Sequence, residues 1–329
     1  MKILLATPLY PPEMEELAVY SKRFAEEMFA VSHEVSLLAY SDYPELINGV
    51  KITVVSKKRK LLFRLFLYTR ELYTLSRDCH VIYAQNTLAS GLPSVIIGKL
   101  RKIPVIIHFS EDEVWKASAR SGLAGESILK YLTSPRKLLK LKLLMILQRR
   151  VLRNSRVVVV PNKTLGELLE YSYRIPKENV VVLQLPAPRI EYLPFETYRT
   201  MRKIVFLSQF SLDETISVIN DLKPEVGDCE IVVLSSRFSR AEKWHHLKSA
   251  NFCVFTDFDS DSLFLDMALV TETPRIVFKD RDSFKKILLK IFNDLTYREA
   301  LVVEGKNSLN QLSWKEHLRN FISIVNHIR

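Results

Sequence analysis

MKILLATPLYPPEMEELAVYSKRFAEEM, residues 1–28, opens the chain with a strand, a turn and a helix in direct succession. The apolar run over 2–7 has the length of a buried strand, and Pro11-Pro12 ends it. From Leu17 onward apolar residues recur with helical spacing, which predicts an amphipathic helix. A strand that feeds a helix through a tight loop is where α/β proteins hold phosphate groups, because free helix N–H groups attract anions. The stretch therefore predicts an α/β fold.

Charged side chains occupy the loop where such proteins usually have glycine. Glycine lets a phosphate approach the backbone closely, whereas Glu15 and Glu16 stand in this position here. Two carboxylates repel an anion. The opening unit therefore has the architecture of a phosphate site and the opposite charge.

A series of motifs in chain order resembles the family 4 retaining glycosyltransferases of the GT-B fold. Pro11-Pro12-Glu13 is similar to the family's Pro-Pro-Glu, which is followed there by one residue and two glycines. Further similar stretches are Ser32–Val35, Val81–Asn86, Ser90–Pro93, Ile103–Ile107 with Asp112 and Trp115, Val157–Pro161, Asn179–Pro186 and Asp282–Ile328. The resemblance is good over 1–190 and weaker over 244–329. It implies two Rossmann-like parallel-sheet domains that face each other across a cleft.

The length and composition agree with two domains. A chain of 329 residues with 47% apolar residues can bury two cores, and prolines from Pro186 to Pro194 indicate a linker. We expect an N-terminal acceptor-side domain over 1–188, a shortened donor-side domain over 189–310, and a final helix over 311–329 that packs back toward the first domain. Strands are expected near 2–7, 34–40, 51–55, 80–84, 104–109, 156–160, 179–184, 203–207, 229–234, 251–256 and 275–278.

The second domain lacks the residues with which the family holds a nucleotide diphosphate. Residues 186–329 contain two glycines, and neither follows a predicted strand at a helix start. Ser208-Gln209 stands where the resemblance places Gly-Arg, and Asp213 or Glu214 stands near the place of a lysine. A diphosphate would lose two cations, and each lost charge-assisted hydrogen bond removes roughly 1.5–3 kcal/mol. Donor binding is therefore expected to be weak or absent.

The remaining donor candidates are two aspartates. The resemblance places Asp266 near the second member of a glutamate pair that grips the ribose, and Asp257 beside the position of the first. The alternative interpretation of both is an acidic, solvated strand end. Alternating aspartates over 257–261 fail the calcium-loop pattern, since Ser262 replaces the required glycine.

In the first domain, Asp112 stands where family members place an acidic residue or a histidine beside the acceptor. Trp115 keeps the local spacing, and the alternative role for Asp112 is a helix N-cap. Glu13, Asn86 and Trp115 are the acceptor-side candidates. His108 ends an apolar strand, which favours a buried core residue over a general base.

Positive charge is concentrated in one stretch of the chain. Residues 51–153 hold 21 Lys/Arg and 6 Asp/Glu, whereas residues 201–329 hold 18 of each. The predicted membrane-facing residues are Lys57, Lys58, Arg59, Lys60 and Arg64. They adjoin large apolar side chains, a combination that suits an anionic membrane surface. For the basic helix near 136–153, a core helix with solvated charges is favoured. No nucleic-acid motif accompanies the charge, so nucleic acid is not an expected partner.

Two functions remain open. The first is transfer of a sugar from a nucleotide-sugar donor to a membrane-associated, lipid-linked or glycan acceptor, with weak or lost activity. The second is a non-catalytic scaffold or regulatory partner of an active glycosyltransferase. Three scattered cysteines form no metal pattern, and no cofactor or metal is expected apart from a nucleotide sugar as substrate. With no signal peptide or membrane span in the sequence, we expect a cytoplasmic protein, peripheral on the inner membrane face.

Overall fold

The computed structural model divides into two compact units. It describes residues 1–13, 16–120, 132, 138–186, 202–206, 212–234, 238, 240–256, 267–268, 271–278, 280–309 and 313–328. The N-terminal unit comprises Met1–Gln184 and His317–Arg329, and the C-terminal unit comprises Leu185–Glu316. The sequence placed these boundaries after residues 188 and 310.

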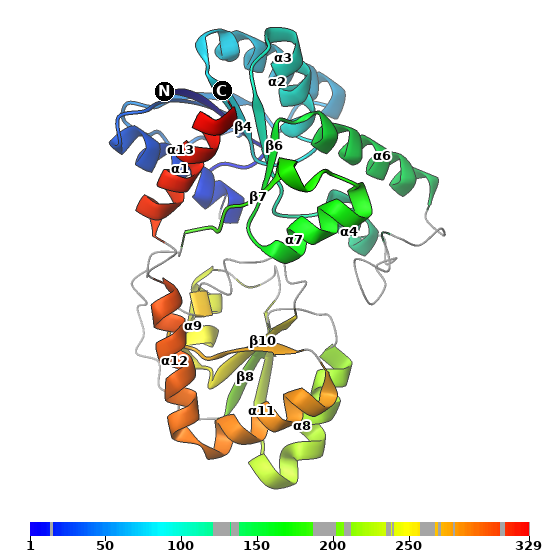
Figure 1. Cartoon of the computed structure of the whole chain (residues 1–329), viewed down its shortest axis with the longest axis vertical. Coiled ribbons are helices and arrows are strands. Elements are labelled where there is room, and N and C mark those ends of the chain that lie inside the picture. The colour runs from blue at the N-terminus through cyan, green and yellow to red at the C-terminus, as the bar shows by residue number, and fades with distance from the viewer. Residues whose placement is uncertain are drawn as a thin grey trace. The chain divides into compact units, whose positions relative to one another are not determined.

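The N-terminal unit is built on a seven-stranded, all-parallel sheet (Figure 1). In chain order its strands are β1 (Lys2–Thr7), β2 (Glu34–Tyr40), β3 (Lys51–Val55), β4 (Val81–Ala84), β5 (Val105–His108), β6 (Val157–Val160) and β7 (Val180–Val182). The strand order across the sheet is β3-β2-β1-β4-β5-β6-β7. Every strand lies within about two residues of its predicted place. The central strands β4 and β6 are uninterrupted apolar runs, and β5 is apolar up to His108, because both faces of the sheet are covered.

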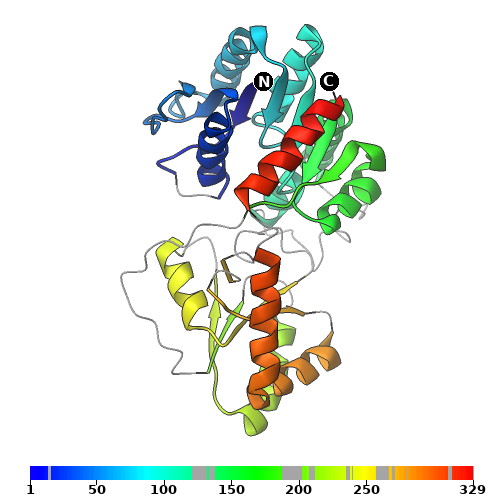
Figure 2. The same cartoon turned by 60° about the vertical axis from the view of Figure 1, so that its left-hand side comes forward.

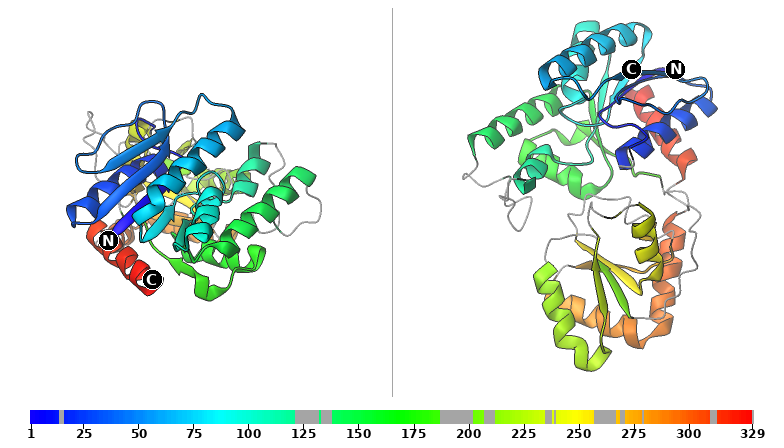
Figure 3. Two further views of the ribbon diagram at one scale, coloured as in Figure 1. Left: turned by 90° about the horizontal axis from the view of Figure 1, so that it is seen from above. Right: turned by 180° about the vertical axis from the view of Figure 1, so that it is seen from behind.

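Helices cover both faces of this sheet. They are α1 (Glu16–Ala30), α2 (Leu61–Leu75), α3 (Gly91–Arg101), α4 (Glu113–Arg120), α6 (Leu139–Asn154), α7 (Lys163–Leu168) and α13 (Trp314–Ile328), with short 3₁₀ or π turns at Ser76–Asp78, Leu169–Tyr173 and Lys177–Asn179. The chain moves in opposite directions from β1 to β2 and from β3 to β7. The right-handed crossovers that are usual between parallel strands therefore put α1 on one face, and α2, α3 and α6 on the other. α13 runs beside α1 (Figures 1 and 3).

The final helix packs into the core of the N-terminal unit. Phe321 is fully buried, with its ring centroid 4.9 Å from that of Phe24 on α1 and 4.8 Å from that of Tyr83 on β4. Nδ1 of His317 donates to the backbone carbonyl of Gln184 at 2.8 Å. Because a carbonyl can only accept, the neutral ring then accepts at Nε2 from the Tyr20 hydroxyl, also at 2.8 Å.

This hydrogen bond begins a buried polar chain that crosses the core. The Tyr20 oxygen accepts from the Tyr83 hydroxyl at 3.1 Å, and the Tyr83 oxygen accepts from Nδ1 of His108 at 3.1 Å. His108 is thus a buried, hydrogen-bonded core residue, the interpretation that the sequence favoured. Burial lowers the pKa of His108 to about 3, with help from nearby His317, and burial lowers the pKa of His317 to about 4.

The described C-terminal unit contains a smaller parallel sheet (Figure 2). Its strands are β8 (Lys203–Phe206), β9 (Glu230–Val233), β10 (Phe252–Thr256) and β11 (Arg275–Phe278), in the order β11-β10-β8-β9, and its helices are α8 (Leu212–Val226), α9 (Arg240–Ser249), α11 (Arg281–Asn293) and α12 (Leu295–Leu309). Phe206 and Phe284 belong to the core beneath α8 and α11, while Val205 and Trp244 belong to the core beneath α9. Successive side chains of β8 therefore point to opposite faces of the sheet and join two separate apolar cores.

The two buried histidines should make the N-terminal unit lose stability as the pH falls below about 6.5. Their folded pKa values are depressed, so the folded state rejects protons that the unfolded chain accepts. The contribution of the two histidines to the free energy of unfolding is complete above their pKa in the unfolded chain. It is lost as the pH falls toward their pKa in the folded protein, by up to about 1.4 kcal/mol per pH unit for each ring.

Urea denaturation between pH 7 and 4.5 measures this slope. His317→Gln should make the slope shallower, while His327→Gln, which alters an exposed histidine on the same helix, should leave it unchanged. Equal slopes in both variants and the unaltered protein would show that the buried rings do not control it.

Candidate functional site at the carboxyl edge of the N-terminal sheet

Strand order identifies one place on the N-terminal sheet as a binding edge. The chain goes from β1 to β2 on one side, and later passes from β3 to β4 on the other side of β1. Open parallel sheets bind ligands outside the carboxyl ends of the strands at such a switch point. Glu13, Asn86 and Asp112 follow β1, β4 and β5, and Trp115 lies in the first turn of the next helix. The sheet therefore brings these sequence-predicted residues to one edge.

A polar cluster links α1 to the carboxyl ends of β1 and β4 at this edge. Ser21 Oγ on α1 lies 3.0 Å from Thr7 Oγ1 and hydrogen-bonds the side-chain oxygen of Gln85. The Gln85 Nε2 amide and the Thr87 hydroxyl have no hydrogen-bond partner in the described chain, although the two residues are 0% and 1% exposed. Buried polar atoms are nearly always paired, so two unpaired ones mark a place for a water molecule or a ligand's polar group.

Asn86, between these two residues, has a strained backbone. Its φ is 149°, a region that costs a residue with a side chain roughly 1–3 kcal/mol. Its Oδ1 accepts from the backbone N–H groups of Leu88 at 2.9 Å and Ala89 at 2.8 Å. Its Nδ2 donates to the carboxylate of Glu113. Strain of this kind persists where surrounding contacts enforce it, and it is concentrated at functional sites.

Sequence reasoning missed Glu113. The residue looks like an ordinary acidic group in the first turn of α4, where a carboxylate is favoured by the helix dipole. The structure instead pairs it with Asn86, from another strand of the sheet. No local sequence pattern predicts a contact between residues 86 and 113, so it could be found only from the structure.

Asp112 acts as the N-cap of α4. Its Oδ1 accepts from the backbone N–H groups of Val114 at 2.9 Å and Trp115 at 2.8 Å. Its Oδ2 accepts from Gln148 Nε2 at 3.1 Å and from the hydroxyl of Tyr173. Burial raises the pKa of Asp112, and these hydrogen bonds oppose that rise. Of the two roles left open by the sequence, the geometry supports the N-cap: the carboxylate is 4% exposed and fully engaged by protein groups.

Glu13 forms an ion pair with Lys57, the first of the predicted membrane-facing cations. Arg64 Nη1 lies 3.4 Å from the backbone carbonyl of Lys57, and its guanidinium stacks 5.1 Å from the ring centroid of Tyr40. These contacts turn Lys57 and Arg64 toward the protein, where they hold the β3–α2 loop. Among these five residues, Lys58, Arg59 and Lys60 are exposed, and Lys57 and Arg64 are partly buried; a membrane-facing role of the five stays a prediction.

The donor-side predictions lie outside the described residues. This holds for Asp257 and Asp266, and for Ser208-Gln209. Within the described ranges, no three His, Cys, Asp or Glu side chains gather in a way that could hold a metal ion.

The N-cap role of Asp112 predicts a structural effect. Asp112→Ala should lower the free energy of unfolding of the N-terminal unit by about 1–3 kcal/mol, because it removes a cap and unpairs buried partners. Glu111→Ala is the matched control, since Glu111 is half exposed and its ion pair with Lys116 is worth roughly 1 kcal/mol or less. Urea denaturation of both variants tests this, and equal losses would contradict the N-cap role.

The comparisons with known proteins agree with this architecture. Residues 16–186 match the family described as Glycosyl transferase 4-like domain. Similar solved structures include a sucrose-phosphate synthase from Thermosynechococcus elongatus, with a TM-score of 0.66 at 11% identity over 100% of this chain and 99% of that one. Anabaena HepE in complex with UDP has a TM-score of 0.61 at 8% identity, covering 99% of this chain and 100% of that one.

A third similar structure is WaaG, a glycosyltransferase involved in lipopolysaccharide biosynthesis, with a TM-score of 0.55 at 11% identity over 96% of this chain and 98% of that one. At these identities the structural similarities establish the fold alone. No curated protein sequence matches the chain. Because the family match spans more than half of its length, the chain belongs to the Glycosyl transferase 4-like family, and its fold is GT-B.

Proposed function

We propose that this protein is a glycosyltransferase-family member that takes a membrane-associated acceptor at the carboxyl edge of its N-terminal sheet. The observation that carries the proposal is the polar cluster at the β1–β4 switch point, with its two unpaired buried atoms and the strained Asn86 held by Glu113. An acceptor hydroxyl is a group that these polar atoms can bind. The cluster lies at the edge where α2 begins.

A nucleotide sugar is the donor class that we propose. The similar fold of HepE holds UDP, which supports this class. Weak or lost turnover is also proposed, from the sequence of the C-terminal unit. With two glycines in residues 186–329 and Ser208-Gln209 at the place of Gly-Arg, a diphosphate has few close amides and few cations to bind.

Isothermal titration calorimetry with UDP-, GDP- and ADP-sugars tests the donor proposal. We expect dissociation constants weaker than about 1 mM for the unaltered protein. Ser208→Gly/Gln209→Arg should strengthen binding about tenfold or more, because one charge-assisted hydrogen bond is worth roughly 1.5–3 kcal/mol. Ser208→Gly/Gln209→Leu is the uncharged control.

The outcomes separate the two functions. Micromolar binding by the unaltered protein would contradict weak turnover and indicate a working transferase. Absence of binding in both the protein and the arginine variant would favour the non-catalytic partner of an active glycosyltransferase.

The proposed membrane contact is the outer face formed by α2, α3 and α6. α3 contacts both of its neighbours, so the three helices form one surface on the same side of the sheet. They carry nine Lys/Arg and a single acidic residue, Glu71. More than half of the exposed large apolar side chains in the described chain lie here. They are Leu61, Leu62, Phe63, Phe66, Tyr73, Ile96, Leu100, Leu138, Leu139, Leu143 and Ile146.

α6 has buried apolar residues on one side and exposed ones on the other. Leu141, Val151 and Leu152 are buried, as expected of a core helix. Leu139 and Leu143 on its other side are 83% and 66% exposed and lie among lysines and arginines. A helix with apolar residues on both sides has more apolar surface than the sheet can cover.

An anionic membrane is the partner that this charge and apolar content fit. Basic residues near an anionic bilayer contribute about 1 kcal/mol each, and exposed leucines gain from insertion at the interface. No helix in the described ranges is long and apolar enough to cross a bilayer. We therefore propose peripheral attachment to a cytoplasmic membrane face, which would bring a lipid-linked acceptor to the adjoining carboxyl edge.

Vesicle co-sedimentation tests this attachment. Leu61→Gln/Leu62→Gln should weaken binding to vesicles that contain phosphatidylglycerol by about tenfold or more, because each leucine contributes up to roughly 1.5–3 kcal/mol when buried. Leu295→Gln/Val303→Gln on α12 removes two comparably exposed apolar side chains from the C-terminal unit and should have little effect. Equal binding by the two double variants would refute the proposed face.

A further inference from the structure

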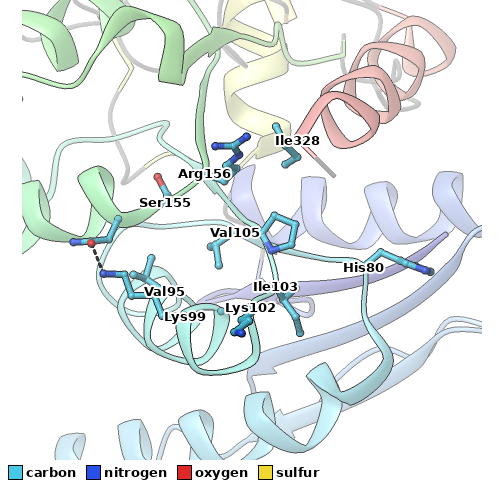
Figure 4. A pocket seen from close by; sticks show the side chains of 12 residues that line it. His80, Val95, Lys99, Lys102, Ile103, Val105, Ser155, Arg156 and Ile328 are labelled. Carbon is cyan, nitrogen blue, oxygen red and sulfur yellow. Dashed lines mark hydrogen bonds between the residues drawn. The ribbon is translucent and has the colours of Figure 1, made fainter.

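A cavity lies at the opposite, amino edge of the N-terminal sheet. It measures about 520 Å³ and opens where α3 ends and where β4, β5 and β6 begin (Figure 4). Its walls include Lys99 and Lys102 from α3 and the turn after it, and Asn154 and Arg156 from the end of α6 and the residues before β6. None of the residues discussed at the carboxyl edge lines it.

The lining of this cavity is strongly basic. Lys99, Lys102 and Arg156 are all exposed, and His80 also lines the wall, while no aspartate or glutamate does. Lys102 and Arg156 make no ion pair with a carboxylate in the part of the chain that the structure describes. Three full positive charges therefore share one cavity, with no carboxylate side chain among its described lining residues.

The C-terminal ends of α3 and α6 offset only part of this positive charge. Each helix C-terminus carries the equivalent of about half a negative charge, which attracts basic side chains. Two such partial charges cannot neutralise two lysines and an arginine. A dianion bound in the cavity would complete the balance.

The fold holds the Lys99 side chain and the Lys102 backbone in place. Lys99 Nζ donates to Asn154 Oδ1, which ties the end of α3 to the end of α6. Lys102 follows α3 with a φ of 58°, in the left-handed region where glycine is usual, and the N–H of Ile103 bonds to the Gly98 carbonyl at 2.9 Å. Lysine here costs conformational energy that glycine would not. Figure 4 shows Lys99 and Lys102 on one side of the cavity and Arg156 on the other.

We propose that this cavity binds the phosphate group of an anionic ligand, through Lys99, Lys102 and Arg156. Ammonium and guanidinium groups are the side chains that bind phosphate most strongly, by charge-assisted hydrogen bonds. The volume exceeds that of a phosphate ion and suits a phosphate monoester with a small organic group. The source is either a lipid headgroup or a free phosphorylated metabolite. Leu100, an exposed residue between Lys99 and Lys102 in sequence, is placed for contact with an acyl chain in the first case.

The test begins with a soluble probe. Calorimetric titration with sn-glycerol 3-phosphate at low salt should give saturable binding to the unaltered protein. Lys102→Gln/Arg156→Gln should weaken it at least tenfold, and both side chains are exposed, so the fold should tolerate the change. Lys285→Gln/Lys286→Gln removes two exposed lysines from α11 with the same loss of net charge and should change binding less than twofold.

Vesicles then distinguish the two sources. Phosphatidic acid presents the same phosphate monoester at a bilayer surface. Greater loss of phosphatidic acid vesicle binding in Lys102→Gln/Arg156→Gln than in the lysine control identifies a lipid headgroup site. Loss confined to the soluble probe identifies a metabolite site.

The proposal fails if the unaltered protein shows no saturable binding to glycerol phosphate, or if the cavity variant and the lysine control lose binding equally. The glycerol phosphate test does not depend on membrane attachment or on donor turnover. Leu61→Gln/Leu62→Gln, which should impair membrane attachment, should bind glycerol phosphate as the unaltered protein does.

Discussion

The handedness of the connections between parallel strands decides where each functional group of the N-terminal unit lies. Crossovers between parallel strands are right-handed as a rule, so reversal of the chain's direction at β1 puts α1 on one face of the sheet and α2, α3 and α6 on the other. The same reversal opens the switch point beside β4, where Gln85 and Thr87 keep unpaired buried atoms. The reversal of strand order at β1 therefore produces both the polar edge and the basic, apolar surface of α2, α3 and α6 beside it.

The final helix depends on a polar contact as well as an apolar one. His317, its first residue within the N-terminal unit, bonds to the carbonyl of Gln184, the residue at which the chain leaves that unit. Both boundaries of the unit therefore meet at one hydrogen bond. The ring can make this bond and accept from Tyr20 only when it is neutral, and burial ensures neutrality. Fully paired networks of this kind favour one arrangement of the core over alternatives.

The strands and most helices could be predicted from sequence because apolar runs and helical periodicity are local properties. The residues that follow the strands could also be placed at one edge, because parallel strands end together. Contacts between residues far apart in the sequence could not be predicted. Examples are the contacts of Glu113 with Asn86 and of Lys57 with Glu13. The role of Asp112 stayed open for the same reason, since Tyr173 engages its carboxylate from another segment. Unpaired atoms such as Thr87 Oγ1 become visible only once all neighbours are placed.

The proposed membrane contact and the basic cavity lie at opposite ends of α6, which bears on how the protein would be oriented on a bilayer. A helix of 16 residues is about 24 Å long, so α6 separates the apolar residues near its start from the basic cavity at its end. A single contact with a bilayer would leave the protein free to pivot. If the ligand of the cavity is a lipid headgroup, two contacts at opposite ends of α6 restrict that pivoting and hold the carboxyl edge at a defined distance from the lipid surface. The proposed membrane-anchored acceptor can reach Asn86 and Glu113 only at a limited range of such distances. A lipid-headgroup site at the amino edge would therefore contribute to the proposed acceptor recognition by orienting the protein, without touching the acceptor.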